Sequence, residues 1–281
     1  MKLNNIILVP TDFSEVCKNA IAYAINIGEI LKFNVCIYHV INKESKNLFG
    51  NGDNTEEVVK SALEDLRNEF AKQTSIQIEI AWEEGSIFDL IHVKAENIGA
   101  NLIVLGTHGK VGMQKLFGSY ALKVITKAQV PTVVVQKKTY PRIQRILFPV
   151  NTFTEARQKV PYAIDVSKVF DSEIVIYKEK VTSQMDMNRI NIITKQIAEA
   201  FQNAGVRYSI ETAEKSGESA RQLVSEAVEG DIDLIMIVTE PQIGSSFFTL
   251  GPWNERIMFN EAQIPVLCIN PVEHSTVYFD L

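Results

Sequence analysis

The sequence predicts an α/β protein with two tandem, doubly wound parallel sheets, and three observations support this prediction. Short apolar segments, such as residues 6–9 and 102–105, have the length of strands that are buried on both faces of a sheet. Between them lie longer segments with apolar residues at helical spacing, as right-handed crossovers require. The pattern then occurs a second time within the 281 residues, a length typical of two domains.

The first half is expected to contain five strands and the helices that connect them. After the first strand, apolar or small residues recur at helical spacing from Cys17 to Leu31. The later elements are expected as a strand at 34–40, a polar surface loop at 42–55, helices at 56–72 and 86–98, and strands at 76–80, 102–105 and 132–136. The helix before the last strand should bury one stripe of residues, namely Ala121, Val124, Ile125 and Ala128.

The second half repeats the first. Residues 146–151 have the pattern of residues 7–12, and residues 262–266 have the pattern of residues 128–132. We therefore expect domains at 1–138 and 143–281, with a linker between them. In the second domain Pro161 should delay or kink the first helix, because proline is disfavoured past the first turn.

Two pairs of small residues suggest a binding site for an anion. Gly106 and Gly109 follow a predicted strand, where the chain must turn sharply or let another group approach its backbone. Gly118 and Ser119 are expected to open the next helix, whose unpaired N–H groups attract anions. A phosphate would fit there. The alternative is that the glycines only shape a turn and Ser119 only caps the helix.

The polar residues near these segments have structural interpretations as well. Asp12 follows the first strand, and with Glu15 it could form a capping box rather than a ligand contact. His39 and His108 have no carboxylate or cysteine at ligand spacing, so packing or surface roles are favoured over a metal site. Lys110 could neutralise a phosphate, although a single loop lysine is usually only solvated. We expect no metal site.

The composition excludes several classes of function. The net charge of −6 without a run of Lys or Arg argues against nucleic acid or an anionic membrane as a partner. The three cysteines are far apart in the sequence, which argues against a disulfide framework or a zinc site. The short apolar run at residues 6–9 is too short for a signal peptide or a membrane span. A cytoplasmic protein is expected.

The order of several motifs resembles the universal stress protein family in its tandem form. These motifs are V-P-T-D-F-S at 9–14, Y-H-V at 38–40, G-T-H-G at 106–109, G-S-Y-A at 118–121 and V-P-T-V-V-V at 130–135. The resemblance implies an adenine nucleotide alpha hydrolase-like fold with strand order 3-2-1-4-5 in each domain. It also implies a cytoplasmic stress or regulatory role and, in one branch of the family, binding of ATP, with or without magnesium.

The resemblance also implies roles for individual residues. The nucleoside would be held by Asp12 and by the backbone of Val40. The phosphates would be held by two pairs of residues, Gly106 with Gly109 and Gly118 with Ser119. The family motif is G-x2-G-x9-G-[ST], whereas residues 110–117 leave only eight residues between the second and third glycines. This shorter loop changes the direction of its amides.

The second copy lacks most of these residues. Asn151 stands where the first copy has Asp12, V-T-E-P at 238–241 replaces the glycine loop, and Gly-Pro at 251–252 replaces Gly-Ser. Prolines remove backbone donors, and a glutamate places negative charge where an anion would bind. We expect a single nucleotide site, in the N-terminal domain.

Three classes of function are candidates for this protein. The first is a regulatory protein that binds ATP or a related adenine nucleotide, and the second is a stress-response scaffold that binds protein partners but no nucleotide. The third, an enzyme, is disfavoured because the first turn lacks a glycine-rich dinucleotide motif and nothing resembles a positioned base or nucleophile. The exposed edge strands expected at 132–136 and 266–269 should pair within one chain as a pseudo-dimer. A homodimer is left open.

Overall fold

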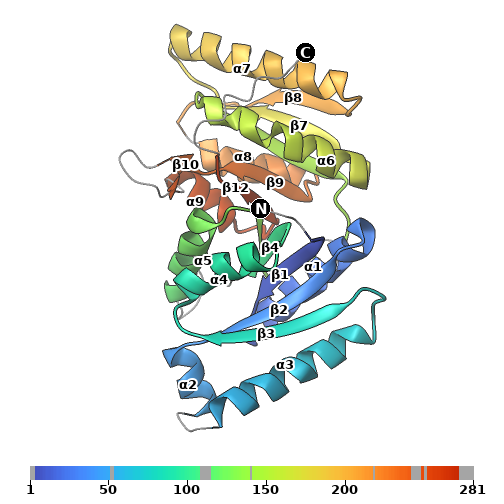
Figure 1. Cartoon of the computed structure of the whole chain (residues 1–281). Coiled ribbons are helices and arrows are strands. Elements are labelled where there is room, and N and C mark those ends of the chain that lie inside the picture. Colours follow the sequence, from blue (N-terminus) through green and yellow to red (C-terminus); the bar gives the residue numbers. More distant parts are fainter. Residues whose placement is uncertain are drawn as a thin grey trace. The chain divides into compact units, whose positions relative to one another are not determined.

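The computed structural model describes residues 4–50, 54–107, 115–139, 141–217, 219–241, 248–249 and 252–271. The chain divides into two compact units, Met1–Pro141 and Arg142–Leu281. Each unit contains a five-stranded parallel sheet. Helices pack against the strands, as Figure 1 shows. The predicted α/β class with tandem doubly wound sheets is therefore confirmed.

The strands of the first unit have the order β3-β2-β1-β4-β5, which is the predicted 3-2-1-4-5 order. Its elements along the chain are β1 (Ile6–Pro10), α1 (Glu15–Leu31), β2 (Asn34–Ile41), α2 (Lys43–Phe49), α3 (Thr55–Ala71), β3 (Ile78–Glu84), α4 (Ile87–Asn97), β4 (Leu102–Gly106), α5 (Lys115–Lys127) and β5 (Thr132–Val135).

The second unit repeats this order as β8-β7-β6-β9-β12. Its elements are β6 (Arg145–Val150), the 3-10 helix η1 (Thr154–Lys159), α6 (Val160–Phe170), β7 (Glu173–Lys178), α7 (Gln184–Asn203), β8 (Tyr208–Thr212), α8 (Ser219–Glu229), β9 (Leu234–Val238), β10 (Glu240–Pro241), β11 (Phe248–Thr249), α9 (Pro252–Met258) and β12 (Val266–Ile269). The antiparallel pair β10–β11 is an addition to the second unit that the sequence did not predict.

Helices cover the central strands, and this explains their uniformly apolar sequences. Helix α1 contacts β1, β2 and β4, while α4 contacts β2 and α5, which lies beside it in Figure 1. The middle residues of β1 are fully buried as a result. The predicted stripe on α5 is also confirmed, because Ala121, Val124, Ile125 and Ala128 are all buried.

Two predicted elements differ from the structure. The segment predicted as a surface loop at 42–55 contains helix α2, because the Asn42 side chain accepts a hydrogen bond from the Ser45 N–H and caps the helix. Helix α5 begins at Lys115 instead of Gly118. Lys, Leu and Phe at 115–117 carry no helix-breaking residue, so the helix extends one turn further toward the N-terminus.

The expected effect of Pro161 on the second unit is confirmed. A 3-10 helix, η1, precedes the regular helix α6, and Pro161 lies within the first two residues of α6. Proline is tolerated at that position because its missing N–H would have no partner there. The start of the α-helix is thereby delayed relative to α1 of the first unit.

Candidate functional site

A crevice opens in the first unit where the strand order reverses. Strands β1 and β4 pair only at Ile7–Leu102 and Leu8–Ile103, and they separate beyond these residues. The chain leaves β1 through α1 and enters β4 from α4, on opposite faces of the sheet. In sheets of this kind, ligands bind in the crevice at the carboxyl ends of the separated strands.

A cavity of about 470 Å³ lies at these strand ends. Its size falls in the range of small-molecule binding sites. Three of the predicted site residues line it together: Asp12 after β1, Val40 in β2 and Gly106 at the end of β4. Apolar residues of α4, β4 and α5 form much of the remaining wall, among them Ile87, Ile91, Leu105, Ala121 and Val124.

Asp12 does not form the capping box that was one interpretation of the sequence. Its Oδ1 accepts a hydrogen bond from the Ser14 N–H at 2.9 Å, whereas Ser14 is the N-cap of α1 and accepts from the Cys17 N–H at 3.4 Å. The carboxylate is thus fixed at the cavity wall by a local turn. Burial and the nearby Asp12 charge raise the pKa of the Cys17 thiol to about 12, so this thiol stays protonated and is a poor nucleophile.

Gly106 is required for a reason that the sequence did not reveal. A Cβ atom at this position would lie 2.8 Å from the carbonyl oxygen of Val16 and 3.1 Å from the Cα of Cys17. The group that approaches this glycine is therefore the backbone of helix α1. The close approach joins the end of β4 to α1 at the base of the cavity.

The other predicted phosphate contacts are placed only in part. Gly109 lies outside the described residues. Gly118 and Ser119 are the fourth and fifth residues of α5, so they lie within its first turns instead of opening the helix. Two later residues of the same helix, Ala121 and Val124, line the cavity.

His39 connects the ends of β1 and β2 with helix α2. Its Nδ1 lies 2.7 Å from the carbonyl oxygen of Thr11, and its Nε2 lies 2.9 Å from the hydroxyl oxygen of Ser45. Because a carbonyl only accepts, Nδ1 carries a hydrogen and donates it to Thr11. Burial lowers the pKa of His39, and the neutral ring then accepts from Ser45 through Nε2.

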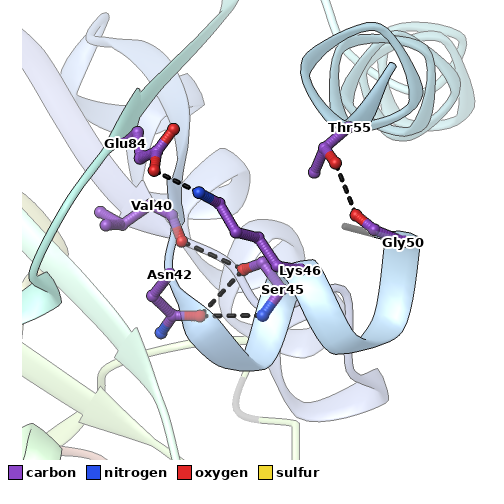
Figure 2. Close-up of polar contacts among 7 residues, drawn as sticks. All are labelled: Val40, Asn42, Ser45, Lys46, Gly50, Thr55 and Glu84. Carbon is purple, nitrogen blue, oxygen red and sulfur yellow. Dashed lines mark hydrogen bonds and ion pairs between the residues drawn. The ribbon is translucent and has the colours of Figure 1, made fainter. Parts of the chain in front are cut away.

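The Ser45 hydroxyl lies among several acceptors, as Figure 2 shows. Besides His39, these are the carbonyl of Val40 at 3.2 Å and Oδ1 of Asn42 at 3.1 Å. A hydroxyl donates its single hydrogen to one acceptor at a time. Bonding of Ser45 to His39 therefore leaves the Val40 carbonyl able to accept from another group.

Helix α2 forms one wall of the cavity, and its last turn and C-cap are bonded to neighbouring segments. Lys46 forms an ion pair with Glu84 at the end of β3, and the Thr55 hydroxyl donates to the carbonyl of Gly50 at 2.5 Å (Figure 2). On its inner side, Phe49 lines the cavity and packs edge-on against Phe13, with ring centroids 5.2 Å apart. The sequence did not predict this wall, although Asn42 is a typical helix cap that could have indicated it.

The aromatic residues beside His39 fix its ring. Phe13 has its centroid 4.7 Å from that of the imidazole, and Phe49 lies at 6.3 Å. Phe13 has a φ of 65°, which is unusual for a bulky residue, and its N–H donates to the Thr11 hydroxyl at 3.0 Å. Strained backbone of this kind concentrates at binding and active sites.

The second unit has the same turn after its first strand, but a lysine side chain lies in the gap between its separated strands. Asn151 Oδ1 accepts from the Phe153 N–H at 3.0 Å, which reproduces the turn that Asp12 makes in the first unit. Strands β6 and β9 pair at only two positions and then separate, as β1 and β4 do. In this case Lys159 lies between them, and its Nζ donates to the carbonyls of Pro149 and Met236.

The described residues contain no group of three or more His, Cys, Asp or Glu side chains arranged to hold a metal ion. None of their helices combines the length and apolar character needed to cross a membrane. All three cysteines are buried free thiols.

Comparison with known proteins agrees with this architecture. The model of the universal stress protein family matches residues 4–136. The universal stress protein MJ0531 of Methanocaldococcus jannaschii is 31% identical over 140 residues, which cover 47% of this chain and 81% of the relative. A second protein of that organism, universal stress protein MJ0577, is 28% identical over 153 residues, which cover 47% of this chain and 94% of the relative.

A solved structure extends the likeness to both units. A universal stress protein from Archaeoglobus fulgidus has a TM-score of 0.76 at 18% identity, covering 95% of this chain and 99% of its own. At this identity the likeness concerns the fold, and it spans both five-stranded sheets. The chain therefore belongs to the universal stress protein family, in the form that carries two such domains in one chain.

Proposed function

We propose that this protein is a cytoplasmic stress-response regulator that binds ATP or a related adenine nucleotide in its N-terminal unit and acts without catalysis. The observation that supports the proposal most strongly is the single cavity that Asp12, Val40 and Gly106 line together. These residues come from three separate parts of the sequence. Their convergence at the carboxyl ends of β1, β2 and β4 is the arrangement expected for a nucleotide in a doubly wound sheet.

The walls of the cavity suit the two parts of a nucleoside. Apolar side chains such as Ile91 and Val124 offer a surface for the planar base. The carboxylate of Asp12 can accept hydrogen bonds from ribose hydroxyls, and such charge-assisted bonds are stronger than neutral ones. The phosphates would extend toward the start of α5.

The second unit is not expected to bind a nucleotide in the same way. Lys159 bridges the separated ends of β6 and β9, in the place that corresponds to the crevice of the first unit. Asn151 lacks the negative charge of Asp12. One nucleotide per chain is therefore proposed.

A stress-response scaffold that binds no nucleotide is the second candidate. The position of Ser119 within α5 supports it, because Ser119 is the fifth residue of the helix and N–H groups beyond the first turn are bonded inside the helix. The shortened loop at 110–117 points the same way. Both features weaken the expected phosphate contacts.

Mass spectrometry of the supernatant from purified, heat-denatured protein tests the proposal. Wild-type protein should release an adenine nucleotide, whereas the Asp12→Asn variant should release much less. Asparagine keeps the oxygen that accepts from Ser14, as Asn151 does for Phe153, but it loses the charge. Equal release from both proteins would show that Asp12 does not bind the nucleotide, and absence of nucleotide together with absence of ATP binding in solution would favour the scaffold.

A further inference from the structure

The hydrogen-bond ladder between β1 and β2 stops one step early. The Asn34 N–H donates to the Asn5 carbonyl, and the Thr11 N–H donates to the Tyr38 carbonyl at 2.8 Å. Parallel ladders repeat every second residue, so this register would next join the Val40 N–H to the Thr11 carbonyl. Among the described residues, this bond from the Val40 N–H to the Thr11 carbonyl is not made.

The Thr11 carbonyl instead accepts from the side chain of His39. The distance of 2.7 Å from Nδ1 to this oxygen indicates a well-formed hydrogen bond. The buried imidazole packs in a cluster with Phe13 and Phe49, and Ser45 satisfies its other nitrogen. The ring is thus fixed in the orientation that holds the Thr11 carbonyl.

We propose that His39 is a positioning residue that keeps the Val40 N–H available to the ligand. A carbonyl oxygen can accept two hydrogen bonds, so the imidazole acts through geometry: its bond orients the Thr11 carbonyl toward the ring and away from the ladder position opposite Val40. The open N–H then faces a partner that brings its own acceptor, and the ring nitrogen of a nucleobase is an acceptor of the right kind. This inference rests on the proposed function, because it assigns a role to His39 in nucleoside binding.

The direction of the Val40 N–H and C=O groups also indicates the class of ligand. In a strand, the N–H and C=O of one residue point to the same side, so both groups of Val40 face the end of β1. With Ser45 donating to His39, the Val40 carbonyl can accept from an exocyclic amine. A base that carries a ring-nitrogen acceptor beside an amine, as adenine does, satisfies both groups.

Two amide variants separate the two hydrogen bonds of His39. In His39→Asn the amide nitrogen takes the place of Nδ1 and can still donate to Thr11, whereas in His39→Gln the amide takes the place of Nε2 and reaches Ser45 instead. Each variant loses one buried hydrogen bond, so the two serve as matched controls for stability. Ser45→Ala is a third variant, which removes the partner of Nε2 and leaves Nδ1 bonded to Thr11.

Amide hydrogen exchange of Val40, followed by NMR on nucleotide-free protein, tests the positioning role directly. The Val40 amide should exchange rapidly in wild-type protein, His39→Asn and Ser45→Ala. In His39→Gln the freed Thr11 carbonyl should capture the Val40 N–H and slow its exchange by about tenfold or more. A Val40 amide protected in ligand-free wild-type protein, or an unchanged rate in His39→Gln, would overturn the inference.

Titration with ATP measures how the same variants change the affinity for the nucleotide. His39→Gln should bind ATP about tenfold more weakly than His39→Asn does, the loss expected for one hydrogen bond, and Ser45→Ala should resemble His39→Asn. Equal affinities of His39→Asn and His39→Gln would contradict the inference even if ATP binds. The absence of ATP binding to wild-type protein would instead overturn the proposed function and with it the ligand assigned to Val40.

Discussion

Lys159 donates from its buried Nζ to the carbonyl oxygen of Met236 at 3.0 Å, across the gap between β6 and β9. The same nitrogen donates to the carbonyl of Pro149 at 2.6 Å and lies 4.1 Å from the centroid of the Phe148 ring. In the first unit, the residue at the same distance from the first strand is Ala20. One unit therefore has a lysine between its separated strands, whereas the other has a small side chain there and an open cavity at the strand ends.

Replacement of Lys159 should destabilise the second unit. Lys159→Met keeps most of the side-chain volume but leaves two buried carbonyls without a donor, and each such group costs about 1–3 kcal/mol. We expect the free energy of unfolding of this unit to fall by a few kcal/mol, measured by urea denaturation at pH 7.5. Lys168→Met, at an exposed position on α6, is the control and should change little. Equal stability of the two variants would contradict the structural role of Lys159.

Gly106 should not tolerate even a methyl group. In Gly106→Ala, the Cβ would lie within 3.1 Å of the backbone of α1 at Val16 and Cys17, so the helix or the strand end must move. Overpacking of this kind costs about 1–3 kcal/mol, and the movement would also distort the cavity. Thermal denaturation of wild type and Gly106→Ala measures the cost. An unchanged melting temperature would show that α1 and β4 are farther apart in solution.

The stability of the first unit should depend on pH through His39. Burial lowers its pKa below the ordinary value of 6.5, against smaller opposing effects of the Thr11 hydrogen bond and the Asp12 charge, so the folded protein binds this proton less readily than the unfolded chain. The contribution of His39 to stability is therefore complete above pH 6.5 and is lost as the pH falls below it. Wild-type protein should lose more stability between pH 7.5 and 5.5 than His39→Asn does, in urea denaturation. Identical losses would show that His39 titrates normally.

The sequence predicted the strands and the repeat because local patterns determine them. Buried parallel strands require apolar runs such as residues 102–105, and a duplicated domain leaves the same motif order twice. The meeting of Asp12, Val40 and Gly106 at one cavity followed from the strand order alone. The pairing of residues 132–136 with 266–269 within one chain stays a prediction.

Other features depend on contacts that no local pattern reveals. Lys159 follows T-E-A-R-Q, a sequence typical of a solvent-exposed helix, and its burial depends on the gap between two distant strands. Gly106 is needed because α1 passes close to it, which is a matter of tertiary packing. Helix α2 was hidden by its polar composition, since only Asn42 indicated that it begins there.

Calorimetric titration of the full chain with ATP and magnesium tests the central claim most directly, namely that one nucleotide binds, in the N-terminal unit. We expect a stoichiometry near one and loss of binding in Gly109→Val, because a side chain at that position would fill the space of a phosphate. Substitutions at Glu240 or Pro241 of the second unit should leave binding unchanged. If no heat is observed, insertion of one residue within 110–117 would show whether the short loop prevents binding. A stoichiometry near two, or binding that survives Gly109→Val, would contradict the account.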